Sequence, residues 1–201
     1  MTENTCPRLI VATDLDGTLL DHHDYSWDAA RPAMAKLENL GIPVILNTSK
    51  TYSEVLDLQQ QLGIAGPFIV ENGSALLLPT EPFNWLLDGL ENANVEHLSE
   101  YYQVVLGARR KDIIDFIHEL RSSNGWQFAG FSDWSVQQIM DNTGLDQTSA
   151  GKAAEKMFSE PIRWDDSAEN LEEFTAQVVQ QDYTLLRGGR FYHVQGQTDK
   201  G

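Results

Sequence analysis

The chain has 201 residues, and its 41% of apolar side chains suffice for one large domain or for a core with a smaller partner. Its net charge of −16 argues against broad binding to nucleic acid or to anionic membranes, because both need basic protein surface, yet it allows a small anionic substrate. No apolar run could cross a bilayer, no signal-peptide pattern is present, and Cys6 has no second cysteine to pair with, so we expect a cytoplasmic protein.

The first part of the chain alternates short apolar runs with helical patterns. Residues 9–13, 43–46 and 67–70 are apolar runs suited to strands buried on both faces. The segments between them have apolar residues at helical spacing, and Ser26 is expected to cap the first helix. Strands that alternate with helices predict an α/β fold with a parallel sheet and right-handed crossovers.

Three polar side chains lie at the carboxyl ends of these predicted strands. They are Asp14, Thr48 and Glu71, one after each strand. Parallel sheets of this kind bind ligands at the carboxyl ends of their strands. We therefore expect the three segments to meet in one pocket.

The pattern changes from about residue 84. Short alternating runs and amphipathic helical segments follow, with a pair of strands expected at 183–186 and 190–194. The sequence predicts a core from 1 to 83, an inserted α+β cap domain from 84 to 193, and a return to the core from 194 to 201.

The first loop contains two carboxylates two residues apart, in Asp14-Leu15-Asp16-Gly17-Thr18. Like charges this close are costly unless a cation or a proton lies between them, and Mg²⁺ is commonly held by one or two carboxylates plus phosphate. Gly17 allows the backbone to turn, so that its N–H can approach a ligand. A surface turn is the alternative, since Asp and Gly are common turn residues. The position directly after a buried strand favours the site.

This motif resembles the first motif of the haloacid dehalogenase superfamily, Asp-x-Asp-x-Thr. The resemblance implies a phosphatase with a Rossmann-like parallel-sheet core and a cap. It implies that Asp14 is the nucleophile that forms an aspartyl phosphate, and that Asp16 is the general acid and base. It also implies a Mg²⁺ cofactor held by Asp14 and by Asp16, whose backbone carbonyl serves in the family, together with acidic residues of a later motif.

Two further motifs of the superfamily have counterparts here. Thr48 stands where the family has a phosphate-binding Ser or Thr, and Lys200, in Asp199-Lys200-Gly201, matches the Lys that neutralises the phosphoryl charge. Gly17 is expected to contact the phosphate as well. Taken alone, Thr48 would be read as a helix-capping residue. Lys50 is placed for a substrate contact, and a solvated lysine is an equal alternative.

The resemblance also implies an acidic fourth motif some tens of residues beyond the Lys. The chain reaches Gly201 without it, and no earlier segment replaces it. We therefore expect a core that is incomplete at its C-terminal end and a metal site that lacks some of its ligands. The expected sheet then has an exposed edge, which favours self-association.

One branch of the superfamily is resembled more closely, the mannosyl-3-phosphoglycerate phosphatases. The strings that carry this resemblance are Asn47-Thr48-Ser49-Lys50-Thr51, Val70-Glu71-Asn72-Gly73, Phe158-Ser159-Glu160-Pro161 and Gly188-Gly189-Arg190-Phe191 followed by His193. Lys156 departs from the branch, which usually has Arg there. Lys cannot make the bidentate carboxylate contact of Arg, so the substrate is less firmly indicated than the chemistry.

A glycosylated phosphoglycerate would offer a carboxylate, a phosphate and sugar hydroxyls. Arg190 and His193 could meet the anionic oxygens, while Glu71 and Asn72 could meet the hydroxyls. Arg190 is equally read as an exposed strand cation, and His193 as a structural histidine. Residues 71–73 are also typical of a hairpin turn.

The leading hypothesis is a Mg²⁺-dependent phosphomonoesterase that acts on mannosyl-3-phosphoglycerate or a related phosphorylated sugar. One alternative is a general hexose-phosphate phosphatase of the same superfamily. Another is a catalytically inactive, truncated module that binds phosphosugars.

Overall fold

The computed structural model describes residues 9–21, 26–81, 90 and 94–200. Cys6, His22 and His23 lie outside this part of the chain. The contacts divide the chain into two compact units, and each is described by itself. The first comprises Met1–Lys50, Glu54–Leu106 and Lys200–Gly201, and the second comprises Thr51–Ser53 and Gly107–Asp199.

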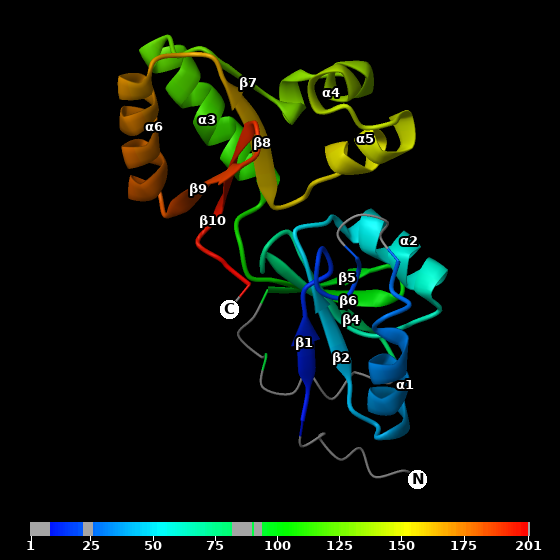
Figure 1. Cartoon of the computed structure of the whole chain (residues 1–201). Coiled ribbons are helices and arrows are strands. Elements are labelled where there is room, and N and C mark those ends of the chain that lie inside the picture. The colour runs from blue at the N-terminus through cyan, green and yellow to red at the C-terminus, as the bar shows by residue number, and fades with distance from the viewer. Residues whose placement is uncertain (1–8, 22–25, 82–89, 91–93, 201) are drawn as a thin grey trace. The chain divides into compact units, whose positions relative to one another are not determined.

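A six-stranded sheet is the centre of the first unit (Figure 1). In spatial order its strands are β1 (Val11–Thr13), β2 (Val44–Asn47), β3 (Phe68–Val70), β4 (Ala75–Pro79), β6 (Tyr101–Val105) and β5 (Asn94–Leu98). The pairs β1–β2 and β2–β3 are parallel, and the helices α1 (Arg31–Asn39) and α2 (Tyr52–Leu62) connect them. The expected α/β fold with a parallel core is confirmed.

The rest of this sheet is antiparallel, which the sequence indicated only through the alternative of a hairpin turn at 71–73. β3 turns directly into β4, β4 pairs with β6, and β5 and β6 form a hairpin. β5 and β6 therefore pair in the first sheet, although their residues follow position 84. The domain boundaries at 84 and 193 stay a prediction.

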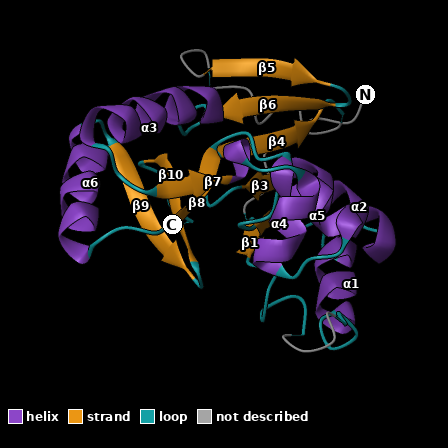
Figure 2. Cartoon of the chain, turned by 90° about the horizontal axis from the view of Figure 1, so that it is seen from above, coloured by secondary structure: helices purple, strands orange, loops and turns teal. Residues whose placement is uncertain are grey.

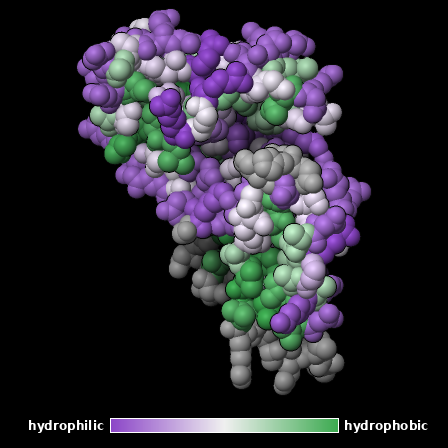
Figure 3. Space-filling view, in the orientation of Figure 1, coloured by the Kyte–Doolittle hydropathy of each residue, from purple (hydrophilic) through white to green (hydrophobic). Residues whose placement is uncertain are grey.

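The first strand is more exposed than predicted. Leu9 and Ile10, in the run expected to be buried, are 55% and 39% exposed. Among the described strands β1 pairs only with β2, so its other edge and flanking side chains have no strand against them. Figure 3 shows apolar side chains gathered over this part of the first unit. The expectation of a strand buried on both faces is wrong for β1.

The first helix also begins later than predicted. α1 starts at Arg31 with Ala30 as N-cap, and no side chain caps it, so Ser26 is not the cap. Pro32 lies in the first turn of the helix. Proline has no N–H to donate and is tolerated only there, so the start of the helix must lie within a turn of Pro32.

The second unit is an α+β arrangement around an antiparallel sheet. In spatial order its strands are β7 (Phe128–Gly130), β8 (Ser159–Trp164), β10 (Phe191–Gly196) and β9 (Tyr183–Gly188). Its helices are α3 (Arg110–Asn124), α4 (Val136–Thr143), α5 (Gln147–Ala154), α6 (Ala168–Gln180) and the short 3-10 helix η2 (Phe131–Asp133).

Helices α3 and α6 lie side by side in this unit (Figure 2). Ile113 and Ile117 from α3 pack against Phe174 and Val178 from α6 in one buried cluster. Residues four apart share a helix face, so each helix presents one apolar face to this core. Ser167 caps α6 by accepting a hydrogen bond from the Asn170 N–H.

Candidate active site

Asp14 follows the last residue of β1 and is held by two donors. Its Oδ1 accepts hydrogen bonds from the Leu15 N–H at 2.8 Å and from the Lys200 ammonium at 3.0 Å. Among the described residues, none donates to Oδ2. Since 40% of the side chain is exposed, Oδ2 is the carboxylate oxygen open to a ligand.

Asp16 is paired with Lys50. The Lys50 ammonium lies 2.8 and 2.9 Å from the two carboxylate oxygens of Asp16. Asp14 and Asp16 therefore each have a lysine partner from another segment. The two positive charges offset the repulsion expected between the close carboxylates. The Lys50 side chain contacts Asp16 here, and its predicted substrate contact stays a prediction.

A backbone hydrogen bond closes the turn that follows Asp16. Gly17 has φ of 75°, a left-handed conformation that glycine adopts without strain. Its N–H donates to the Leu20 carbonyl at 2.9 Å, so this donor is already engaged within the loop. The predicted contact between Gly17 and phosphate is untested.

The loops that follow β2 and β3 are joined by hydrogen bonds. Thr48 is fully buried, its Oγ1 accepts from the Lys50 N–H at 3.2 Å, and its carbonyl accepts from the Asn72 N–H at 3.0 Å. The Glu71 N–H donates to the Lys50 carbonyl at 3.1 Å. The structure therefore brings Thr48, Lys50, Glu71 and Asn72 together beside the first loop.

Glu71 and Asn72 have unusual backbone conformations. Their φ values are 47° and 58°, in the left-handed region that costs non-glycine residues about 1 kcal/mol or more. They form the turn between β3 and β4, as the hairpin alternative predicted, and Glu71 is only 1% exposed. Strained residues of this kind are enriched at ligand sites.

One residue of this region had no role assigned from sequence. Asn47, the last residue of β2, donates from its side-chain nitrogen to the Lys200 carbonyl at 2.8 Å. The sequence does contain a signal for this residue, because a polar side chain follows the apolar run 43–46 directly. Its partner is 153 positions away, so no local pattern could identify the contact.

The Asp14 carboxylate and the Asp16 backbone carbonyl are the oxygen atoms of the first loop that would hold a metal at this site. Within the described ranges, no group of three or more His, Cys, Asp or Glu side chains forms a metal cluster. Asp14 and Asp16 supply hard oxygen ligands, and Mg²⁺ is often held by one or two carboxylates, with water and substrate phosphate completing its shell. The donor set therefore fits Mg²⁺ bound together with a phosphorylated substrate.

Arg190 and His193 lie in the second unit. Arg190 follows β9 in an exposed turn and donates to the Thr143 carbonyl at 3.1 Å. His193 lies in β10, and burial together with the positive charge of Lys156 lowers its pKa from 6.5 to about 4. His193 is therefore neutral near pH 7, as a buried structural histidine would be, and the predicted substrate contacts of both residues are untested.

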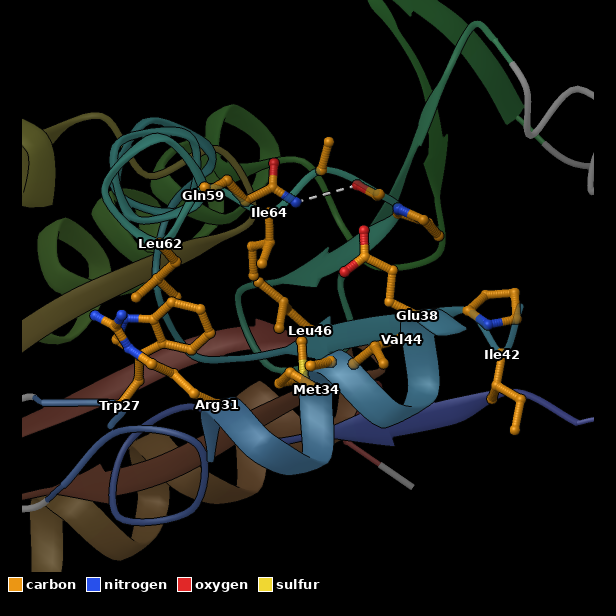
Figure 4. A pocket seen from close by; sticks show the side chains of 16 residues that line it. Trp27, Arg31, Met34, Glu38, Ile42, Val44, Leu46, Gln59, Leu62 and Ile64 are labelled. Carbon is orange, nitrogen blue, oxygen red and sulfur yellow. Dashed lines mark hydrogen bonds between the residues drawn. The ribbon is translucent and has the colours of Figure 1, made fainter. Parts of the chain in front are cut away.

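A cavity of about 560 Å³ opens elsewhere in the first unit (Figure 4). Its lining includes Ile42 before β2, Val44 at the start of β2, Met34 of α1, Leu62 of α2 and Ile64 in the loop before β3. None of the predicted site residues lines it. Asp14, Thr48 and Glu71 follow the carboxyl ends of β1, β2 and β3, whereas the cavity lies against the segments that lead into β2 and β3 and against Val44 and Leu46 of β2.

Comparisons with known proteins agree on the family. The family model of haloacid dehalogenase-like hydrolases matches residues 11–184. A glucosyl-3-phosphoglycerate/mannosyl-3-phosphoglycerate phosphatase from Persephonella marina is 36% identical over 198 residues, covering 96% of this chain and 69% of that protein. A protein of the same description from Methanococcoides burtonii is 35% identical, with the same coverage of each chain.

The fold has solved counterparts as well. A phosphatase of this superfamily from Bacteroides thetaiotaomicron superposes with a TM-score of 0.59 at 15% identity, covering 99% of this chain and 73% of that one. At this identity the likeness concerns the fold alone. Among the described residues, no helix is long and apolar enough to span a membrane.

The resemblance to the superfamily, inferred from the first loop, is confirmed, and so is the resemblance to the mannosyl-3-phosphoglycerate phosphatases, inferred from the four short strings. The chain belongs to the family of haloacid dehalogenase-like hydrolases.

Proposed function

We propose that the protein is a phosphomonoesterase that hydrolyses a glycosyl-3-phosphoglycerate through an aspartyl phosphate on Asp14. The observation that carries the proposal is the environment of Asp14, with Oδ1 held by two donors and Oδ2 open to a ligand. A nucleophile needs one oxygen fixed in orientation and one oxygen free to attack.

In the first step Asp14 Oδ2 attacks the phosphorus, and the bond from phosphorus to the sugar or glycerate oxygen breaks. Before this step Asp16 takes up a proton from solvent and leaves its ion pair with Lys50, and it then gives this proton to the leaving oxygen as general acid. In the second step water attacks the phosphorus and gives a proton to Asp16. The acyl-phosphate bond then breaks, which releases inorganic phosphate and restores the Asp14 carboxylate.

Positive charge next to the phosphoryl group stabilises both steps. The Lys200 ammonium, 3.0 Å from Asp14 Oδ1, is proposed to neutralise charge that develops on the phosphoryl oxygens. Thr48 is proposed to donate its hydroxyl hydrogen to the phosphate, since its Oγ1 already accepts from the Lys50 N–H. Mg²⁺ held by Asp14 and Asp16, when bound, adds further neutralisation of phosphate charge.

The two similar proteins, from Persephonella marina and Methanococcoides burtonii, support the substrate class, because both are named for glucosyl- and mannosyl-3-phosphoglycerate. Glu71 and Asn72 are proposed to meet sugar hydroxyls from the β3–β4 turn. Arg190 and His193 are proposed to contribute from the second unit. The neutral imidazole of His193 suits a hydrogen bond better than an ion pair.

Release of phosphate from mannosyl-3-phosphoglycerate, glucosyl-3-phosphoglycerate and simple hexose phosphates, with and without Mg²⁺, tests this proposal. We expect hydrolysis of the glycosyl-phosphoglycerates that requires Mg²⁺ and is lost in Asp14→Asn. A preference for hexose phosphates would replace the substrate class with the general sugar phosphatase. Hydrolysis that is unchanged in Asp14→Asn would contradict the mechanism.

A second candidate is a module that binds phosphosugars without hydrolysing them. It is favoured by the ion pairs of Lys50 and Lys200, which neutralise both carboxylates without a metal. Equilibrium dialysis with mannosyl-3-phosphoglycerate separates the two candidates. Binding that persists in Mg²⁺ for hours without release of phosphate would support the module and contradict the phosphatase.

A further inference from the structure

Asn47 occupies a central position in the first sheet. It ends β2, which pairs with β1 on one side and β3 on the other, and it is 8% exposed. Paired strands on both sides fix its backbone. The register places Thr13 of β1 beside Leu46 of β2, so the next residues along the two strands are Asp14 and Asn47.

The side chain of Asn47 points away from the cavity. Val44 and Leu46 of β2 line the cavity on the side of α1 and α2. Successive side chains of a strand alternate between the two faces, so Asn47 lies on the opposite face of the sheet. There its amide nitrogen donates to the Lys200 carbonyl at 2.8 Å.

Lys200 thus connects Asn47 with the nucleophile. Its backbone carbonyl is held by Asn47, and its ammonium lies 3.0 Å from Asp14 Oδ1. A lysine side chain is long and flexible, and holding its backbone reduces the freedom that must be lost to place the ammonium. The amide of Asn47 therefore limits where the charge of Lys200 can lie.

Stability alone does not account for an amide at this position. Asparagine is disfavoured in strands, and the Oδ1 of Asn47 is buried without a hydrogen-bond partner among the described residues. A buried polar atom without a partner costs free energy. An apolar side chain would avoid this cost, but it would leave the Lys200 carbonyl without its donor.

We propose that Asn47 is a positioning residue, which sets the place of the Lys200 ammonium for phosphoryl transfer. The inference rests on the proposed function. Because Asn47 acts through the backbone of Lys200, its loss should lower kcat and leave KM largely unchanged. We expect a loss of about threefold to tenfold, the usual effect of one neutral hydrogen bond.

A double-mutant cycle tests the inference by kcat for hydrolysis of mannosyl-3-phosphoglycerate. The single variants are Asn47→Leu, which keeps the size of the side chain, Asn47→Ala and Lys200→Ala. The double variants combine each change at Asn47 with Lys200→Ala. Lys200→Ala alone should cost about 10²- to 10³-fold. In the Lys200→Ala background, either change at Asn47 should cost less than about twofold, because the charge to be positioned is absent.

Gln103 of β6 provides a matched control. It is another buried strand amide of the same sheet, 3% exposed, and its Oε1 also lacks a hydrogen-bond partner among the described residues. Gln103→Leu should leave kcat within about twofold of the wild type. Thermal melting establishes that each variant is folded. If Asn47→Leu does not fold, Asn47→Ala replaces it in the cycle.

The outcomes separate the inference from the proposed function. Losses at Asn47 that are equal with and without the Lys200 side chain would overturn the positioning role, as would a rise in KM alone. A loss in Gln103→Leu equal to that in Asn47→Leu would also overturn it. If the wild-type protein releases no phosphate from any phosphomonoester, the proposed function itself fails.

Discussion

His193 should make the second unit less stable as the pH falls below neutral. The side chain is partly buried in β10, where its register partners are Pro161 of β8 and Leu186 of β9. Burial, and then the positive charge of Lys156, lower the pKa of His193 from 6.5 to about 4. Protonation is therefore easier in the unfolded chain than in the folded one.

The direction in which stability changes with pH follows from the number of protons that the folded and unfolded states bind. Between pH 6.5 and about 4 the unfolded state binds more protons than the folded state, so the stabilisation is complete above this window and is lost as the pH falls through it. The full shift of the pKa corresponds to about 3 kcal/mol, at roughly 1.4 kcal/mol for each unit. At about pH 5 the linkage relation gives a loss of roughly 2 kcal/mol relative to pH 7.

Urea unfolding at pH 7 and at pH 5 measures this loss. The wild type should lose roughly 2 kcal/mol more than His193→Gln between the two pH values, because glutamine does not titrate. Lys156→Met removes one cause of the lowered pKa, so its loss should be smaller than that of the wild type. Equal losses in the wild type and in His193→Gln would refute the reasoning.

Three further changes have defined expectations. Asp14→Asn should lower hydrolysis, measured as released phosphate, by about 10⁴-fold, and full activity would exclude Asp14 as nucleophile. Arg110→Ala should lower the free energy of unfolding by about 3–5 kcal/mol, because it leaves the buried Glu160 carboxylate without its cation, whereas Lys111→Ala, at an exposed position, should leave it nearly unchanged. Gly196→Ala should lower the melting temperature of the second unit and cost about 1–3 kcal/mol, because its new Cβ would lie 2.6 Å from a backbone nitrogen; an unchanged melting temperature would contradict the close packing there.

Local patterns were sufficient for the parallel part of the fold. The runs 43–46 and 67–70 agree within one residue with β2 and β3, because a continuous apolar run is typical of a buried strand in a parallel sheet. The position of Asp14 after β1 followed from the same pattern. The exposure of β1 could not be predicted from this pattern, since it depends on which segments of the chain lie beside the strand.

The sequence did not predict which distant segments of the chain pair with each other. The antiparallel partners β4 and β6 carry apolar runs that fit either direction, so no residue in them specifies the pairing. The contact from Asn47 to Lys200 and the pairing of Lys50 with Asp16 exist only after the loops have come together. A lysine in a loop is equally typical of a solvated side chain, so its partner emerges from the tertiary structure.

The most direct test of the central claim is to trap a phosphoryl group on Asp14. The leaving group of p-nitrophenyl phosphate needs no proton, whereas release of the phosphoryl group needs a base, so Asp16→Asn should accumulate the intermediate with this substrate. Acid quenching and peptide mass spectrometry should then find one phosphoryl group on Asp14, together with a burst of nitrophenolate that matches it in amount. A burst with Asp14 unmodified, or with the phosphoryl group on another side chain, would contradict the assignment of Asp14 as nucleophile.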